Sequence, residues 1–168
     1  LVAAETCRHL AVAQERYGDA SLALTGGSMG GAVVRALARP DGATAQACRG
    51  LDWARVDVWW SDERFLPHGD PDRNDTQADE DGLLDIGLDP LRIFRAPDPS
   101  TTADDLKAAA LRYEARLDRH PGAQDVPGIS GGRAPRIDVM LLGVGPDGHV
   151  ARSEEHTSEL QSLRVISY

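Results

Sequence analysis

The sequence predicts an α/β fold, with an open, doubly wound and mostly parallel sheet that carries helices on both faces. Helix-like and strand-like segments alternate along the whole chain, beginning with a helix. The strand-like segments are nearly continuous apolar runs, which is typical of parallel strands buried on both faces. At 168 residues the chain is long enough for one domain with a hydrophobic core.

The chain begins with a predicted helix and a buried strand. Apolar side chains recur at three- and four-residue steps over residues 1–17, and Gly18 follows as a C-terminal cap. A buried strand is predicted at 21–25, within "SLALTGGS". The segment "MGGAVVRALAR" at 29–39 then predicts a short helix, because Pro40 follows its last turn.

The middle of the chain contains a second predicted strand and a long polar loop. Residues 41–52 are expected to be loop or partly helical. The β-branched and aromatic residues of "RVDVWW" predict a strand at 55–60, and "SDERFLPHGDPDRND" at 61–75 predicts a polar loop directly after it. A helix with an acidic first part is predicted at 74–84, and "RIFRA" at 92–96 is a short strand candidate.

One more helix and the most strand-like run in the chain follow. The helix is predicted to begin at Thr101 or Thr102, either of which can cap it, and to end at "HPG" at 120–122. Residues 122–136 are rich in glycine and proline and are predicted to form a surface loop. The run "IDVMLLG" predicts a strand at 137–143.

Charge and composition argue against several classes of protein. The net charge of −9 argues against binding to nucleic acid and against docking on anionic membranes. No apolar run approaches the roughly 20 residues of a membrane helix, and the first residues lack the pattern of a signal peptide. Cys7 and Cys48 have neither a disulfide-framework nor a metal-ligand spacing, so we expect buried thiols in a reducing cytoplasm.

Three polar loops follow predicted strands, and two of them are rich in glycine. They are "TGGSMGG" at 25–31, "SDER" at 61–64 and "GVGPDGH" at 143–149. In an open parallel sheet, ligands bind beyond the carboxyl ends of the strands, where such loops lie. The sequence therefore predicts a binding site formed by these three loops.

The first loop resembles an anion cradle. Gly26 and Gly27 remove side chains where backbone N–H groups converge, Ser28 adds a hydroxyl, and the following helix adds the positive end of its dipole. The loop is neither a Walker A motif nor a dinucleotide-binding fingerprint. Two alternatives stay open: a plain tight turn, and a G-x-S-x-G nucleophile elbow with Ser28 as nucleophile.

The second and third loops supply charged and basic side chains. Arg64 can donate two hydrogen bonds to a phosphate or carboxylate, and Asp62 can orient a hydroxyl or a histidine. The alternative is that these residues are a run of solvated charges. Asp147 can hold His149 in one tautomer as a general base, unless it only caps the turn. The histidines lie in separate segments, so no metal site is predicted.

These motifs together resemble the 6-phosphogluconolactonase family. The resemblance lies in "LTGGS" at 24–28, "DWARVDVWWSDERFLP" at 52–67, "DRND" at 72–75 and "IDVMLLGVGPDGHVA" at 137–151, in this order. Glucosamine-6-phosphate deaminases are similar in fold and in the histidine loop. Their counterpart of "SDER" normally lacks the arginine, so Arg64 favours the lactonase.

The resemblance implies hydrolysis of 6-phosphoglucono-δ-lactone to 6-phosphogluconate in the oxidative pentose phosphate pathway, without metal or organic cofactor. It implies that His149 activates water, that Asp147 positions His149 or the sugar, and that Arg64 binds the anionic substrate or the developing oxyanion. The expected partner is a small phosphosugar lactone, and the oligomeric state stays open. The predicted substrate- and phosphate-binding residues are Gly26, Gly27, Ser28, Asp62 and Gly145.

The chain is predicted to contain a partial sugar-phosphate lactonase domain at 1–151 and a non-native tail at 152–168. The tail "RSEEHTSELQSLRVISY" resembles a translated sequencing adapter and stands where the family continues with "SLFPG"-like sequence; a native amphipathic helix is the alternative. Leu1 already lies in a helical pattern, so we expect residues upstream. Two other functions stay open: a glucosamine-6-phosphate deaminase, and a non-catalytic sugar-phosphate sensor.

Overall fold

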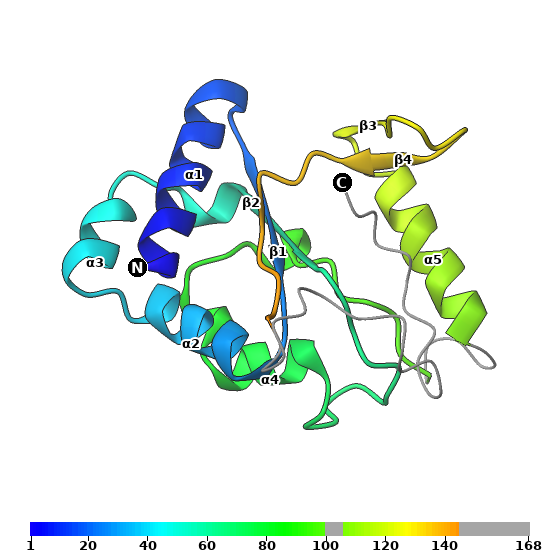
Figure 1. Ribbon diagram of the computed structural model, residues 1–168, viewed down its shortest axis with the longest axis horizontal. Coiled ribbons are helices and arrows are strands. Elements are labelled where there is room, and N and C mark those ends of the chain that lie inside the picture. Colours follow the sequence, from blue (N-terminus) through cyan, green and yellow to red (C-terminus); the bar gives the residue numbers. More distant parts are fainter. Residues whose placement is uncertain (100–105, 145–168) are drawn as a thin grey trace.

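The computed structural model describes residues 1–99 and 106–144, in which a short parallel sheet lies between helices (Figure 1). The strand order is β2-β1-β5, and both pairings are parallel. The strands are β1 (Ala20–Leu24), β2 (Val56–Trp60) and β5 (Val139–Met140). This part of the chain confirms the predicted α/β class with a parallel sheet.

The register of the two long strands brings their following loops to one edge. Ala20 pairs with Val56, and Leu24 pairs with Trp60. The backbone N–H of Ser61 donates to the Leu24 carbonyl at 2.8 Å, so the pairing continues just past the last strand residue. Because parallel strands end on the same side, the glycine turn after β1 and the charged loop after β2 begin as neighbours.

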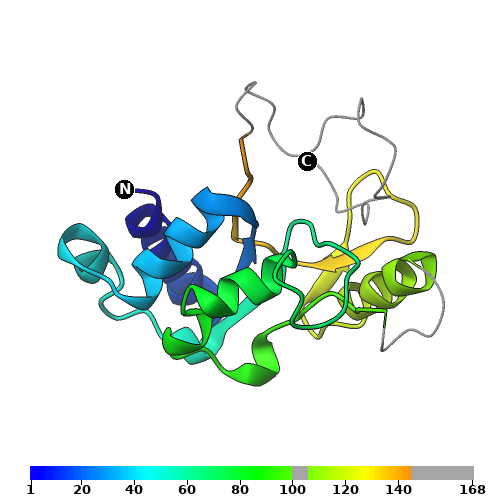
Figure 2. The same ribbon diagram turned by 90° about the horizontal axis from the view of Figure 1, so that it is seen from below.

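Helices cover both faces of the sheet. On one side lie α1 (Val2–Tyr17), α2 (Gly27–Ala38) and α3 (Gly42–Ala47), and on the other lies α5 (Leu106–Asp118), as both views show (Figure 1, Figure 2). The alternation of side chains along a strand explains this arrangement, because successive residues point to opposite faces. Every residue of β1 and β2 is buried, as expected for strands covered on both faces.

Each face has its own apolar cluster. Leu22 of β1 and Val58 of β2 belong to the larger cluster, which α1 and α2 complete. The next residues along the strands, Ala23 and Trp59, belong to a second cluster with Tyr113 of α5. Burial of the Tyr113 hydroxyl raises its pKa to about 12.

Shorter elements connect these layers. Among residues 1–99 and 106–144, no helix has both the length and the apolar character needed to cross a membrane. The short elements are helix α4 (Asn74–Glu80), the 3-10 turns Trp53–Arg55, Leu83–Asp85 and Pro90–Arg92, and the antiparallel strand pair β3 (Ala123–Asp125) and β4 (Arg133–Pro135).

The early elements match their predictions closely. The helix predicted at 1–17 is α1, and Gly18 closes it in the left-handed conformation at φ 87°. The strands predicted at 21–25 and 55–60 are β1 and β2, each within one residue at either end. The helix predicted at 29–39 is α2, which begins two residues earlier than predicted. Gly27 and Ser28, expected to belong to the turn, form its first residues, and Gly26 is its N-cap.

Three later predictions need correction. Residues 92–96 are not a strand: Ile93 makes a single bridge to Val58, and the chain then leaves the sheet. The expected surface loop at 122–136 contains the β3–β4 pair. The strand expected at 137–143 is shorter than predicted: it comprises Val139–Met140, which pair with Leu22 and Ala23 of β1. The expected cap at Thr101 or Thr102 lies outside the described residues.

The two cysteines also differ from the prediction. Cys7 of α1 and Cys48, the C-terminal cap of α3, form a disulfide bond with their Cα atoms 5.0 Å apart. The prediction of two buried thiols is therefore wrong. Their separation of 41 residues gives no sign of this pairing, which arises because α3 packs against α1.

Candidate functional site

The glycine turn after β1 packs directly on the loop after β2. Gly26 is the N-cap of α2 in an extended conformation, and a Cβ placed on it would lie 1.8 Å from Oδ1 of Asn74. Only glycine allows this approach. The chain after β5 also reaches the turn, since a Cβ on Gly143 would lie 3.6 Å from Oγ1 of Thr25. The described parts of the three loops therefore meet at one edge.

The turn presents free hydrogen-bond donors to solvent. Gly27 has a φ of 77°, a conformation that favours glycine, and is exposed together with Ser28. The first N–H groups of a helix have no partner within that helix. At α2, the Gly27 N–H makes only a long contact of 3.4 Å to Oε1 of Gln77. The turn therefore has the geometry of an anion cradle.

Asn74 connects Arg64 to this turn. One guanidinium nitrogen of Arg64, Nη1, donates to Oδ1 of Asn74 at 2.8 Å and to the Asp72 carbonyl at 2.9 Å. The Asn74 amide in turn donates to the Asp62 carbonyl at 2.9 Å. Arg64 is exposed, and within the described chain its Nε and Nη2 have no partner. The arginine is thus held along one edge, which leaves the opposite edge for a ligand.

Glu63 holds the charged loop to helix α4. Its carboxylate, only 2% exposed, accepts from the backbone N–H groups of Asn74 at 2.7 Å and Asp75 at 2.9 Å. It therefore caps α4, which has no cap from its own N-cap residue. Burial raises the pKa of Glu63, and the N–H groups from which it accepts offset only part of that rise.

A buried ion pair lies next to this cap. Arg73 donates from Nε to Oδ1 of Asp75 at 2.7 Å and from Nη2 to Oδ2 at 2.9 Å. Its remaining bonds go to the carbonyls of Leu66 at 2.9 Å and Ala96 at 3.0 Å. Burial on its own raises the pKa of Asp75, but the hydrogen bonds and charge of Arg73 outweigh it and hold that pKa below its ordinary value. The pair ties the long loop to the chain that follows α4.

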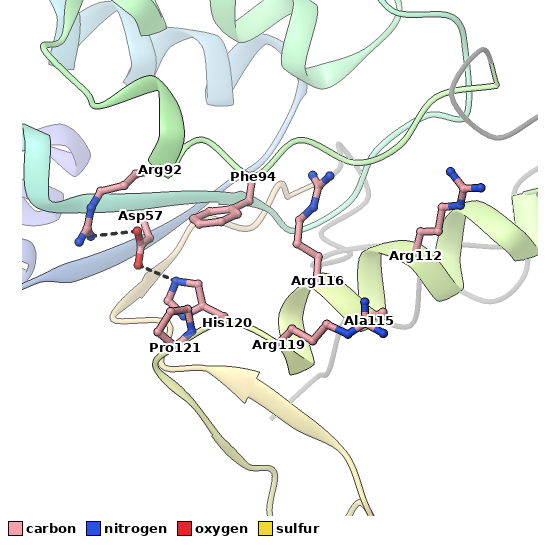
Figure 3. Close-up of a pocket in the computed structure, with 9 residues that line it drawn as sticks. All are labelled: Asp57, Arg92, Phe94, Arg112, Ala115, Arg116, Arg119, His120 and Pro121. Carbon is pink, nitrogen blue, oxygen red and sulfur yellow. Dashed lines mark hydrogen bonds and ion pairs between the residues drawn. The ribbon is translucent and has the colours of Figure 1, made fainter.

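A histidine–aspartate pair occurs elsewhere, on the face that α5 covers (Figure 3). His120 Nε2 lies 3.2 Å from Oδ2 of Asp57, and Arg92 donates to Oδ1 at 3.0 Å. The Gly122 N–H donates to His120 Nδ1 at 3.1 Å, which assigns the ring proton to Nε2. Both ring nitrogens are therefore occupied, so His120 is not a free general base. Burial raises the pKa of Asp57, offset only in part by Arg92 and His120.

The structure brings together those predicted site residues that it describes. None of the described residues form a group of three His, Cys, Asp or Glu side chains that could hold a metal ion. Three predicted residues, Gly145, Asp147 and His149, lie outside the described residues. The predicted residues that lie at the edge formed by the first two loops are Gly26, Gly27, Ser28, Asp62 and Arg64.

A comparison with known families decides which group of proteins shares this arrangement. The model of the family described as "Glucosamine-6-phosphate isomerases/6-phosphogluconolactonase" matches residues 1–159. The chain belongs to this family. The family resemblance carried by the four sequence motifs is therefore confirmed.

Members of the family with curated names include close relatives of the chain. It is 43% identical over 156 residues to a 6-phosphogluconolactonase of Streptomyces coelicolor, covering 92% of this chain and 56% of the relative. It is 38% identical over 152 residues to a 6-phosphogluconolactonase of Mycobacterium tuberculosis, covering 89% and 56%. The chain thus spans about half the length of the curated relatives that it matches.

Solved structures of the family share the fold. A 6-phosphogluconolactonase from Trypanosoma brucei, 25% identical, matches with a TM-score of 0.65 over 89% of this chain and 57% of that one. A monomeric glucosamine-6-phosphate deaminase, 24% identical, matches with a TM-score of 0.58 over 89% and 52%. The second likeness concerns the fold alone, so the fold does not separate the two activities.

Local sequence patterns do not identify the residues that hold the candidate site in place. The "DRND" motif enters the sequence analysis only through the resemblance, although it contributes the buried residues Arg73, Asn74 and Asp75. Glu63 stands between Asp62 and Arg64 in the sequence, and no role is predicted for it. A helix start eleven residues after Glu63 gives no local capping signal, so only the tertiary structure shows this contact.

Proposed function

We propose that the chain takes part in the hydrolysis of 6-phosphoglucono-1,5-lactone to 6-phosphogluconate, a carboxylic ester hydrolysis. The observation that supports this most is the contact of Asn74 with both Arg64 and Gly26. It links an anion cradle to an exposed arginine at one edge of the sheet. The names of the Streptomyces and Mycobacterium relatives support the same activity.

The substrate needs two anchors, because its phosphate and its lactone carbonyl lie at opposite ends of the sugar. We assign the phosphate to the turn at Gly26, Gly27 and Ser28, where the α2 dipole and free N–H groups favour an anion. Arg64 binds the anionic substrate or the oxyanion that develops on the carbonyl oxygen. Asp62 and Gly145 contact the sugar.

His149 and Asp147 supply the proton transfers in this proposal. His149 takes a proton from water, the hydroxide oxygen bonds to the lactone carbon, and the negative charge moves to the carbonyl oxygen. The ring C–O bond then breaks and the ring oxygen takes the proton, which leaves a carboxylic acid and an open sugar chain. Asp147 orients His149. No cofactor is needed, because water is the only second reactant.

In this mechanism Ser28 is a phosphate ligand and not a nucleophile. A nucleophilic serine needs a base that takes its proton, and the base in this proposal, His149, activates water instead. The exposed place of Ser28 in the first turn of α2 suits a phosphate ligand. The cytoplasm remains the predicted location, and the oligomeric state is left open.

Hydrolysis is measured directly, as acid released from freshly prepared 6-phosphogluconolactone at constant pH. The chain, and the complete protein encoded by its gene, are compared with their His149→Ala and Arg64→Gln variants. We expect His149→Ala to remove most of the rate above spontaneous hydrolysis while phosphosugar binding persists. Release of ammonia from glucosamine-6-phosphate, or binding of 6-phosphogluconate by the complete protein without any turnover, would replace the proposal by a deaminase or a sensor.

A further inference from the structure

A second concave surface lies away from the candidate site, between β2 and α5 (Figure 3). It has a volume of about 630 Å³, within the range typical of small-molecule sites. Asp57, the second residue of β2, lies in its wall, whereas the candidate site begins beyond the last residue of that strand. The two surfaces therefore belong to different parts of the sheet.

The lining of this hollow is strongly cationic. Arg112 and Arg116 line it from α5, and Arg119 lines it from the residue just beyond the end of that helix. Arg92 lines it from the segment that precedes the Ile93 bridge. The whole chain has a net charge of −9, so this local excess of positive charge runs against the average.

Among the described residues that line the hollow, one carries a carboxylate, Asp57, and it is already paired. Asp57 accepts a hydrogen bond from Arg92 on Oδ1 at 3.0 Å, and its Oδ2 lies 3.2 Å from His120 Nε2. It therefore presents little free negative charge to the hollow. Arg119 is exposed and has no partner within the described residues. Arg116 uses Nη1 to donate to the Arg95 carbonyl at 2.8 Å, which fixes its guanidinium beside the hollow. Figure 3 shows the side chains of Arg112 and Arg116 extending from α5.

The wall between the arginines is aromatic. Phe94 lines the hollow and stacks on Trp59, with ring centroids 4.1 Å apart and planes 6° apart. The His120 ring meets the Phe94 ring edge-on at 5.3 Å. These contacts hold the Phe94 ring rigidly, so that it offers a fixed apolar surface to the part of a ligand that carries no charge.

We infer that this hollow is an anion-binding site, separate from the lactone site, for a small ligand that carries at least two phosphate groups. One arginine guanidinium group can donate two parallel hydrogen bonds to two oxygens of the same phosphate. Several arginines on two walls of the hollow therefore suit a ligand with more than one phosphate. A nucleoside diphosphate and a free inorganic polyphosphate share this chemistry. The aromatic wall distinguishes them, because only the nucleotide has a ring to place against it.

The test is titration of the 168-residue chain with inorganic pyrophosphate and, separately, with ADP at constant ionic strength. Backbone amide shifts in NMR spectra follow the binding. We expect saturable binding of pyrophosphate with a dissociation constant of about 1 mM or tighter, and shift changes centred on α5. Tighter binding of ADP than of pyrophosphate identifies a nucleotide site, and equal binding identifies the phosphates as the whole ligand.

Matched variants separate a built site from general charge attraction. Arg119→Gln and Arg116→Gln should each weaken binding about tenfold, which is the effect of losing one charge-assisted contact. Arg49→Gln removes the same charge just beyond α3, on the other side of the sheet, and should change binding less than about twofold. Arg49 and Arg119 are both exposed, so neither variant disturbs the core.

Three results would overturn the inference. One is the lack of saturable binding up to about 10 mM pyrophosphate, far beyond the affinity expected of several arginines. Another is an equal loss in Arg49→Gln and Arg119→Gln, which would mean attraction by overall charge. The third is a set of shift changes confined to Gly26–Ser28, which would place the phosphate in the lactone site instead. The lactonase assay is independent of all three.

Discussion

Replacing Asp75 by asparagine tests whether the buried ion pair holds the candidate site together. The Asp75 side chain is fully buried and Arg73 is 1% exposed, and two hydrogen bonds join them. Asparagine keeps the shape of the side chain but removes its charge and one acceptor. Arg73 then keeps the remaining side-chain oxygen and two carbonyls as acceptors. Its nearby negative charges are then Glu63, whose Oε2 lies 3.8 Å from Nη2, and Asp98.

The expected loss follows from this burial. Removing one partner of a buried ion pair typically costs about 3–5 kcal/mol, because the other charge is left uncompensated. We expect about 3 kcal/mol here, at the lower end of that range, since Glu63 partly replaces Asp75. The folded-state pKa of Asp75 lies below its unfolded value of roughly 3.9. Its stabilisation is therefore complete above about pH 4 and is lost as the pH falls through the folded pKa.

Urea unfolding of the chain, followed by circular dichroism, measures this loss at pH 7 and at pH 3. The matched control is Asp79→Asn on the same helix, where the pair with Arg95 is only partly buried and is worth less than about 1 kcal/mol. The difference between wild type and Asp75→Asn should shrink at pH 3. A loss at pH 7 no larger than that of Asp79→Asn would refute the reasoning.

Three further changes probe other contacts. Gly26→Ala should lower the free energy of unfolding by about 1–3 kcal/mol, since its Cβ would lie 1.8 Å from Asn74 Oδ1; an unchanged urea midpoint would contradict that packing. Cys7→Ser removes the bond to Cys48 and should cost about 3–4 kcal/mol, seen as a lower melting temperature that reducing agent does not lower further. Asn74→Ala should reduce lactone kcat/KM about tenfold by releasing Arg64, whereas Asn74→Asp, which keeps the acceptor, should retain more activity in the same assay.

The parts of the fold that sequence reasoning predicted are those set by local pattern. The run "SLAL" and the run "VDVWW" read as buried strands because every position in them is covered, on one face or the other. Gly18 ends α1 because a left-handed residue there suits glycine. The strand expected at 92–96 does not form. A strand needs a neighbouring strand along its whole length, and within this described segment the bridge to β2 is made by Ile93 alone.

The sequence by itself determined the α/β class, the long helices and the placing of Gly26 and Arg64 after two strands, because apolar periodicity and glycine act over a few residues. Only the tertiary structure decided that Asn74 joins these two loops, that Glu63 caps a helix eleven residues later, and that Cys7 meets Cys48. Each of these contacts depends on how distant segments pack. Packing is a property of the whole chain, so no short pattern of residues records it.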